Sequence, residues 1–330
     1  MIRHRILKFC RKVYAKFVHT LDWHIRPDEI DCDSQKASDK IYELLSSGRP
    51  CMIARYGSTE LSMLNNYMSI MSESHSAIKF VRGEECEWWW DESIMQQMRD
   101  WSGFFPVSKV YLGRFCEMML EDTALLDVLG KWIRGESYLK VHLQDVFSCH
   151  LMHLEPFWAP KPWTRALSGK RIVVVHPFAE TISSQYMKNR QKLFLNKEIL
   201  PEFGSLRTVK AVQSLGGGTG EFQDWFAALE WMKHEIDKED YDICLIGCGA
   251  YGFPLAAHVK RSGKQAVHLG GALQLLFGII GRRWEDPNYG VKEWNIPVGM
   301  YSRLVNDYWV RPGEMDKPQN ANQVESACYW

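Results

Sequence analysis

The sequence predicts an α/β fold, namely a Rossmann-like, mostly parallel sheet with helices on both faces. Short β-branched or apolar runs at residues 172–175 and 242–246 are typical of strands covered on both faces. Such runs alternate with amphipathic helical patterns, as at 221–238, and this alternation favours a parallel sheet. A glycine turn stands between a strand and a helix at 247–252, which is typical of such sheets.

The remaining elements follow from the same periodicities and from glycine and proline boundaries. The first part of the chain predicts a helix at 38–46, a strand at 51–56, a helix to about 67, mainly helices at 84–134, and a proline-rich connector at 156–162. The second part predicts strands at 172–175, 206–213, 242–246 and 266–269, and helices at 180–194, 221–238, 254–261 and 272–277. The last 40 residues, rich in Trp, Pro and Asn, predict an irregular tail.

The N-terminus predicts a basic amphipathic helix. Its apolar residues recur at helical spacing: Ile2, Ile6, Phe9, Val13, Phe17 and Leu21. Its positive residues are Arg3, Arg5, Lys8, Arg11, Lys12 and Lys16. Two interpretations stay open, a helix in residues 1–26 that lies on an anionic membrane surface, and a docking helix with a solvated basic face.

Composition narrows the functional classes. Lys+Arg and Asp+Glu balance at 40 each, so we expect no nucleic-acid partner. Nine cysteines without a C-x-x-C pair fit a reducing compartment, and we expect a cytoplasmic protein. No apolar run reaches the roughly 18 residues that span a bilayer, and no secretory signal is expected. Fourteen tryptophans indicate packing or, alternatively, stacking against sugar rings or bases.

The strongest motif is GCGAYG at residues 247–252, a literal G-x-G-x-x-G between a predicted strand and a predicted helix. Its glycines allow close backbone approach, and the helix start offers free N–H groups, so the turn suits a phosphate or diphosphate. The predicted contacts are Gly247, Gly249, Ala250, Tyr251 and Gly252. The alternative is a turn needed only for strand–helix packing.

A second glycine turn follows the next predicted strand, at Gly270 and Gly271. Two such turns at strand carboxyl ends describe the crevice in which open α/β sheets bind ligands. A dinucleotide site would also need an acid at the end of that strand, but the strand and its turn end in HLGG, at residues 268–271, without an acid, so NAD is disfavoured. The loop 214–220 lacks the G-K-[ST] ending of a P-loop, and it predicts either a lid or a connector.

The stretch RYGSTEL, at residues 55–61, ends another predicted strand and begins a helix. Arg55 suits neutralisation of a diphosphate, and Glu60 suits a divalent metal or a general base. Helix capping by Ser58 and Thr59, with Glu60 in the first turn, is the alternative. Other candidate bases are His176 and Glu180, at the end of the strand 172–175.

RYGSTEL resembles the R-F-G-D-G-E-[LF] signature of the GT-D-fold glycosyltransferases, first described as a domain of unknown function. Further similar segments are residues 246–252, GKQA at 263–266, and HLG at 268–270, so the resemblance spans roughly residues 38–280. It implies transfer of a sugar from a nucleotide-sugar donor to a glycan or lipid-linked acceptor in bacterial surface polysaccharide synthesis. It also implies that Arg55, Tyr56, Gly57 and Ser58 contact that donor.

The chain departs from the family pattern where a metal is expected. Ser58 replaces the aspartate of the signature, His268 replaces a second aspartate, and Gly271 stands where the family has a histidine. Either Glu60 and His268 bind Mn²⁺ or Mg²⁺, or the enzyme works without a metal. In the second case positive groups would stabilise the leaving diphosphate. The candidates are Arg55, Arg282 and Arg283.

The expected organisation has four parts: the helix and linker at 1–34, an N-terminal part of the α/β domain with a helical insertion at 35–160, a Rossmann-like nucleotide-sugar-binding part at 161–290, and a tail at 291–330. Two alternative functions stay open. One is an NAD-linked sugar-modifying enzyme. The other is a non-catalytic protein that binds nucleotides or glycans, for which a degenerate Ser58-x-Glu60 would be expected.

Overall fold

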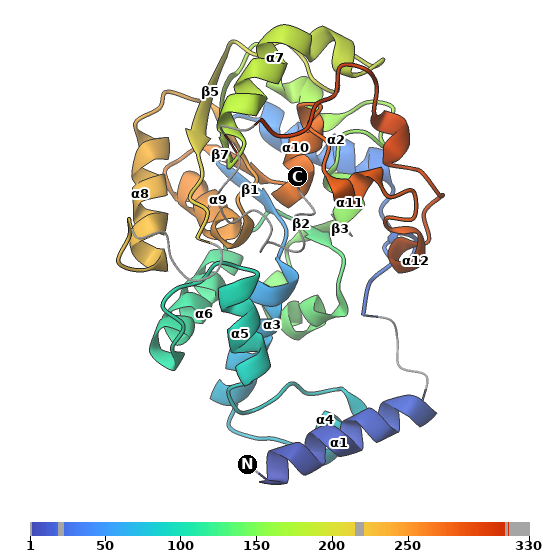
Figure 1. Ribbon diagram of the computed structural model, residues 1–330, viewed down its shortest axis with the longest axis vertical. Helices are drawn as coiled ribbons and strands as arrows, with labels where there is room; N and C mark the ends of the chain where they lie inside the picture. The colour runs from blue at the N-terminus through green and yellow to red at the C-terminus, as the bar shows by residue number, and fades with distance from the viewer. Residues whose placement is uncertain (1, 19–22, 215–220, 314–315, 317–330) are drawn as a thin grey trace.

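In the computed structural model, which describes residues 2–18, 23–214, 221–313 and 316, seven short strands form one parallel sheet (Figure 1). The strands are β1 (Cys51–Ala54), β2 (Val128–Lys131), β3 (Phe147–His150), β4 (Arg171–His176), β5 (Ser205–Lys210), β6 (Ile243–Ile246) and β7 (Gln265–His268). Their order across the sheet is β3-β2-β1-β7-β6-β4-β5, and every pair is parallel. The predicted fold class is therefore confirmed.

Helices connect the strands and cover both faces of the sheet. The α-helices are α1 (Ile2–Phe17), α2 (Ser34–Ser46), α3 (Ser58–Met71), α4 (Ala77–Arg82), α5 (Glu92–Asp100), α6 (Lys109–Thr123), α7 (Ala179–Leu193), α8 (Trp225–Asp237), α9 (Gly252–Arg261), α10 (Leu273–Leu276), α11 (Arg282–Glu285) and α12 (Val291–Trp294). Short 3₁₀ helices are η1 (Pro27–Glu29), η2 (Arg134–Leu143), η3 (Leu151–Leu154), η4 (Trp163–Leu167), η5 (Gly249–Tyr251), η6 (Gly270–Ala272) and η7 (Ser302–Leu304).

Alternation along each strand builds two hydrophobic cores, one on each face. In β4, Val173 and Val175 belong to the core under α3, α6, α8 and α9, whereas Ile172 and Val174 belong to the core under α2, α7 and α10. Successive side chains of a strand point to opposite faces, so a continuous apolar run is required when both faces are covered. This is why these strands read as β-branched runs and not as alternating patterns.

The two halves of the chain contribute to the same sheet. β7 lies between β1 and β6, and Ala266 pairs with both Met52 of β1 and Cys244 of β6. The predicted parts 35–160 and 161–290 are thus joined through their central strands. From β4 the chain moves outward to β5, whereas from β6 it moves inward to β7, and such a reversal places a crevice at the carboxyl edge of the sheet.

The prediction of mainly helices over 84–134 is wrong at β2, and β3 was not predicted. β2 reads VLGK and β3 reads FSCH, so neither is the continuous apolar run that marks a buried strand. Gly130 in β2 allows close packing, because an added Cβ atom would lie 2.5 Å from Leu154 Cδ1. The sequence holds no local sign of this tertiary contact.

The other predicted elements occur with shifted ends. Helix α2 begins at Ser34, four residues before the expected start, because the Asp33 side chain accepts a hydrogen bond from the Lys36 N–H at 2.8 Å and caps it. The predicted helix at 272–277 begins instead as the 3₁₀ turn η6. The predictions made for residues 215–220 and 317–330 lie outside the described residues.

The N-terminal helix is confirmed as α1, and the part of its predicted pattern at Leu21 lies outside the described residues. It packs against α4 at the end of the molecule toward which the carboxyl ends of the strands point (Figure 1). Among the described residues, no helix combines the length and the apolar character needed to cross a membrane.

Candidate functional site

The carboxyl edge of the sheet opens into a cavity of about 620 Å³. Its walls come from the segments that follow β1, β2, β4, β5, β6 and β7, from residues at 23–24 and 101–102, and from α11, α12 and the segment between them. Pockets of about 300–1,000 Å³ are typical of small-molecule sites. Segments that are far apart in the sequence therefore meet around a space of the size that one nucleotide-like ligand would need.

The corner between β1 and α3 places Glu60 beside the start of a helix. Gly57 is the N-cap residue of α3, and the Glu60 side chain folds back over it. A Cβ atom on Gly57 would lie 1.7 Å from Glu60 Oε2, so no larger residue fits there without moving the carboxylate. Glu60 is 8% exposed and lines the cavity together with Ser58 and Thr59. The predicted capping by Ser58 and Thr59 is wrong, because both lie inside α3 and no side chain makes a capping hydrogen bond to its N-cap residue, Gly57. A carboxylate in the first turn still stabilises a helix through its dipole, so Glu60 is compatible with that role as well as with a catalytic one.

Arg55 links the β1 corner to the glycine turn after β7. An added Cβ atom on Gly270 would lie 3.6 Å from Arg55 Cδ, and Gly270 has a positive φ of 62°. The guanidinium carbon of Arg55 lies 5.0 Å from the centre of the Trp132 ring. A cation over an indole face is stabilised electrostatically. Arg55 is thus held at the cavity wall by an aromatic surface and lies against the second glycine turn.

Trp132, which supports Arg55, is itself fixed by two hydrogen bonds. Its indole Nε1 donates to the Tyr56 carbonyl oxygen at 3.0 Å, and its backbone N–H donates to Glu136 at 3.2 Å. Burial raises the pKa of Glu136 to about 8, although the Trp132 N–H and the charges of Lys131 and Arg55 lower it. The indole therefore has a defined position beneath the arginine.

The three glycines of the G-x-G-x-x-G turn have different roles. Gly247 permits close approach of two turns, because an added Cβ atom would lie 2.7 Å from the Gly270 carbonyl oxygen. Gly249 has a φ of 57° with open space around it, so the requirement there is conformational. Gly252 packs α9 against β7, since an added Cβ atom would lie 2.1 Å from His268 Cε1. Gly247 and Gly249 line the cavity.

Tyr251 fixes the same turn from behind. Its ring stacks on Trp225 with centroids 4.6 Å apart, and its hydroxyl lies 2.8 Å from the Ser214 hydroxyl. Burial raises the pKa of Tyr251, so its hydroxyl is protonated at neutral pH. Tyr251 and Ala250 both line the cavity.

His176 ends β4 and lines the cavity, but it is buried. Burial lowers the pKa of His176 to about 3, so the imidazole is neutral at pH 7. Its Nδ1 accepts a hydrogen bond from the Phe178 backbone N–H at 2.9 Å, which assigns the proton to Nε2. A histidine in this state donates a hydrogen bond through Nε2, and its position fits the predicted role of base poorly.

Several predicted site residues lie away from the cavity lining: Tyr56, Glu180, Gly252, His268 and Arg282. Tyr56 points into the core, where its hydroxyl lies 2.6 Å from Thr123 Oγ1 and its ring stacks on Phe253. Glu180 is exposed at the start of α7. Arg282 is exposed, whereas its neighbour Arg283 lines the cavity. The remaining predicted residues, including Gly270 and Gly271, do line it.

The predicted metal pair is not brought together at the cavity. Glu60 lines it, but His268 packs against Gly252, and its Nδ1 lies 3.2 Å from the Ile246 carbonyl oxygen. Burial, assisted by the charge of Arg55, lowers the pKa of His268 to about 3. Within the described residues, no three His, Cys, Asp or Glu side chains gather in a way that would hold a metal ion.

The cavity also contains side chains that the sequence did not single out. Aromatic rings come from Trp23, Trp101, Trp132, Tyr289 and Trp294, and carboxylates come from Asp286 and Glu293. The abundance of tryptophan was a sequence signal for the indoles among them, and the carboxylates had none. Indole and phenol faces suit stacking against a base or a sugar ring.

Nothing matches this chain in comparisons with protein-family models, with curated proteins and with solved structures. The resemblance to the GT-D-fold glycosyltransferases therefore stays a prediction that depends on the quoted motifs.

Proposed function

We propose that the protein is a glycosyltransferase that moves a sugar from a nucleotide-sugar donor to a glycan or lipid-linked acceptor in bacterial surface polysaccharide synthesis. One observation carries the proposal: Arg55 and two glycine turns, about 190 to 215 residues apart in the sequence, line the same cavity. An arginine beside backbone turns and a helix start is an arrangement suited to a diphosphate. The RYGSTEL resemblance adds the expectation that this diphosphate belongs to a nucleotide sugar.

In the proposed complex the diphosphate lies between the turn at 247–251 and the turn at 270–271, with Arg55 beside it. Arg283, on the cavity wall, supplies a second positive charge in place of the predicted Arg282. The neutral His176 donates from Nε2 to an oxygen of the ligand. The nucleoside or the sugar stacks on the aromatic part of the wall, which includes Trp132 and Tyr289.

The reaction is a displacement at the anomeric carbon. The acceptor hydroxyl oxygen forms a bond to that carbon, the bond to the diphosphate oxygen breaks, and the diphosphate leaves with the electron pair. Glu60 takes the hydroxyl proton, because it is the carboxylate that the family signature and the cavity have in common. Arg55 and Arg283 stabilise the negative charge that develops on the leaving group.

The predicted metal site does not fit the positions of its two residues, so no step is assigned to Mn²⁺ or Mg²⁺. Glu60 is at the cavity wall, whereas His268 fills the space between α9 and β7. The dependence of donor binding on these ions is a separate measurement. If donor binding requires either ion, the cavity carboxylates Asp286 and Glu293 are the ligands to test by substitution.

The first test is donor binding. UDP- and GDP-linked hexoses, with and without Mg²⁺ or Mn²⁺, should raise the melting temperature of the wild-type protein. Arg55→Ala should weaken the binding of the active compound by about 10- to 100-fold, because a charged hydrogen bond is lost. The matched control is Arg282→Ala, which removes an exposed arginine outside the cavity and should change binding less than about twofold.

The second test is turnover, measured as release of nucleoside diphosphate from the bound donor. Glu60→Gln keeps the shape of the side chain over Gly57 and should lower turnover by about 10²- to 10⁴-fold while donor binding persists. Glu180→Gln, at an exposed carboxylate outside the cavity, is the control and should leave turnover unchanged. Full turnover in Glu60→Gln, with only a small loss of stability, would assign Glu60 to stabilisation of the first turn of α3 and contradict its catalytic role.

The same experiments separate the alternatives. Tight binding of NAD, with no response to nucleotide sugars, would favour an NAD-linked sugar-modifying enzyme. Gly252 is consistent with that alternative, because it packs a helix against a strand as the third glycine of a dinucleotide motif does. Binding of nucleotide sugars without any release of nucleoside diphosphate, in the presence or absence of metal, would favour a non-catalytic binding protein. We place the proposed enzyme in the cytoplasm, where nucleotide sugars are made available.

A further inference from the structure

Helix α1 turns its apolar side away from the protein. The exposed fractions are 56% for Ile6, 66% for Phe9, 37% for Val13 and 85% for Phe17. These residues recur at intervals of three and four, so they form one continuous stripe along the helix. An amphipathic helix of a globular protein ordinarily buries this stripe in the core.

The opposite side of α1 makes the contacts to the body, and these contacts are largely polar or cationic. The His4 ring stacks on Trp89 with centroids 4.0 Å apart, and Lys8 forms an ion pair with Asp91. The guanidinium of Arg11 lies 4.9 Å from the centre of the Phe80 ring. The orientation of α1 is therefore specified by its own side chains, and it leaves the stripe uncovered by the described residues.

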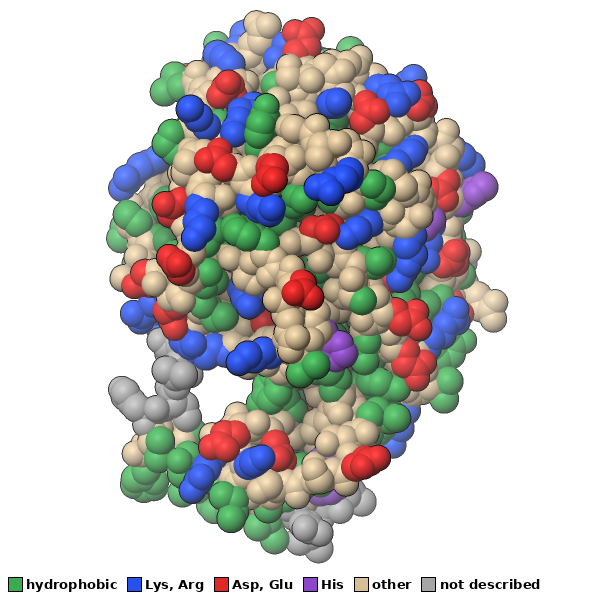
Figure 2. Space-filling model, turned by 180° about the vertical axis from the view of Figure 1, so that it is seen from behind, with side chains coloured by type: hydrophobic (Ala, Val, Ile, Leu, Met, Phe, Trp, Pro, Cys, Tyr) green, Lys and Arg blue, Asp and Glu red, His purple; other side chains and the backbone are tan. Residues whose placement is uncertain are grey.

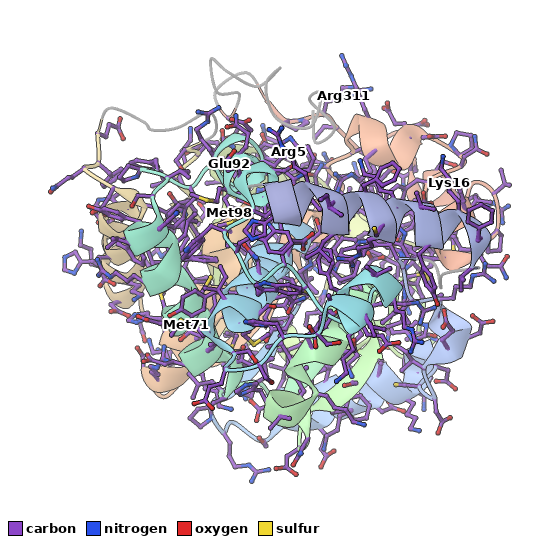
Figure 3. The ribbon with its side chains drawn as sticks, turned by 90° about the horizontal axis from the view of Figure 1, so that it is seen from below. Arg5, Lys16, Met71, Glu92, Met98 and Arg311 are labelled. Carbon is purple, nitrogen blue, oxygen red and sulfur yellow. The ribbon has the colours of Figure 1, made fainter. Side chains whose placement is uncertain are left out.

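Positive charge borders the stripe. Arg5, Lys12 and Lys16 are exposed, and their spacing of seven and four residues places them along one edge of it. Residues 2–17 contain no acidic side chain, although the chain as a whole has a net charge of zero. Figure 3 shows α1 across the near side of the molecule with Arg5 toward one end and Lys16 toward the other. Figure 2 shows the lower lobe from behind, with hydrophobic side chains beside basic and acidic ones.

We propose that α1 binds the surface of an anionic lipid bilayer, with the stripe in the acyl–headgroup boundary and the basic edge against the headgroups. A second copy of the chain suits this surface less well, because residues 2–17 of that copy would offer no acidic side chain to the basic edge. This helix lies on the membrane and does not cross it, since none of the described helices is long and apolar enough.

This binding mode would also orient the cavity. The carboxyl ends of the strands point toward the end of the molecule that carries α1 (Figure 1). Trp23 and His24, which follow α1 closely in the chain, line the cavity. A bilayer bound to α1 would therefore lie on the side of the molecule on which the cavity is built. The inference depends on the exposed stripe and its basic edge, and it would survive failure of the proposed reaction.

The experiment is sedimentation of the full chain with vesicles. The protein should co-sediment with vesicles of phosphatidylcholine that contain about one third phosphatidylglycerol. Much less of it should co-sediment with vesicles of pure phosphatidylcholine. Phe9→Glu with Phe17→Glu should lower the binding constant by more than about tenfold, because two buried apolar groups become charged. The matched control, Met187→Glu with Leu195→Glu, makes the same change at side chains 82% and 101% exposed elsewhere and should bind as the wild type.

A second variant keeps the stripe and removes charge. Lys12→Gln with Lys16→Gln should lower binding to the anionic vesicles by roughly 25-fold, about fivefold for each charge, and added salt should have a similar effect. Circular dichroism and the unfolding midpoint establish that each variant is folded.

Three outcomes would overturn the inference. The wild type fails to bind anionic vesicles, the variants with Phe9 and Phe17 replaced bind as well as the control, or ultracentrifugation shows a dimer that those variants lose while no vesicle binding occurs. The last result would assign the stripe to a second copy of this chain.

Discussion

Helices α1 and α8 have similar apolar patterns, but the apolar side is exposed in α1 and buried in α8. In α8 the apolar residues are buried in the core on one face of the sheet: Trp225, Phe226, Leu229, Met232 and Ile236. In α1 the stripe of Ile6, Phe9, Val13 and Phe17 is exposed. Both helices were predicted from periodicity, and both formed. The difference teaches that a periodic pattern specifies an element and its apolar face, whereas the surroundings decide what covers that face.

The largest expected effect tests this difference directly. Leu229→Ala should lower the free energy of unfolding by about 2–5 kcal/mol, because it leaves a cavity in a closed core. Phe9→Ala removes a larger side chain from α1 but should change that free energy by less than about 0.5 kcal/mol. Urea unfolding measures both. A comparable loss in the two variants would mean that the stripe of α1 is covered in solution, and the comparison would fail.

Local sequence rules were sufficient for the centre of the sheet. β6 and the turn after it could be predicted because a buried apolar run and a glycine motif are both local features. The buried position of Tyr56 also follows from a local pattern, namely the alternation along the strand. Tyr56 continues the alternation of Met52 and Ala54 into one core, so it had to point away from the side on which Arg55 lies.

The rest of the cavity wall depends on contacts between distant segments. Trp23 and Tyr289 line it because residues 23–24 and 283–294 lie at the carboxyl edge of the sheet. No local sequence pattern predicts that these two segments meet there. The choice between Arg282 and Arg283 is similar, since adjacent residues on a helix point in different directions and only packing selects one. Metal ligands were proposed from motif positions, and His268 shows that a motif position can be filled for packing.

The next effect concerns burial of a titratable group. Burial lowers the pKa of His176 to about 3, below the value of about 6.5 for an unfolded chain, so protonation favours the unfolded state. The stability from this histidine is therefore present above about pH 6.5 and is lost as the pH falls toward 3. Between pH 7 and pH 5.5 the loss should be about 1 kcal/mol.

The free energy of unfolding of His176→Asn, measured at several pH values, should decline less with falling pH than that of the wild type. The difference between the two declines is the contribution of His176. His234→Asn provides the control, because His234 is exposed on α8 and its replacement should leave the decline unchanged. If the two variants follow the same pH dependence, His176 is accessible to water in solution. A water-accessible His176 would again be a candidate general base.

The smallest expected effect concerns the docking of α1. Arg11 faces the body, where it covers the Phe80 ring and lies 3.7 Å from Glu87, whereas Arg5 is exposed. Arg11→Ala should destabilise the docked helix by about 0.5–1 kcal/mol, because a partly exposed cation–π contact and a weak ion pair are lost. Arg5→Ala, the matched control, should change nothing in the absence of lipid. Amide hydrogen exchange within residues 5–17 measures the docking locally, since opening of α1 need not unfold the sheet. Faster exchange in Arg5→Ala than in Arg11→Ala would mean that α1 docks through its other side, with the apolar stripe turned inward as in α8.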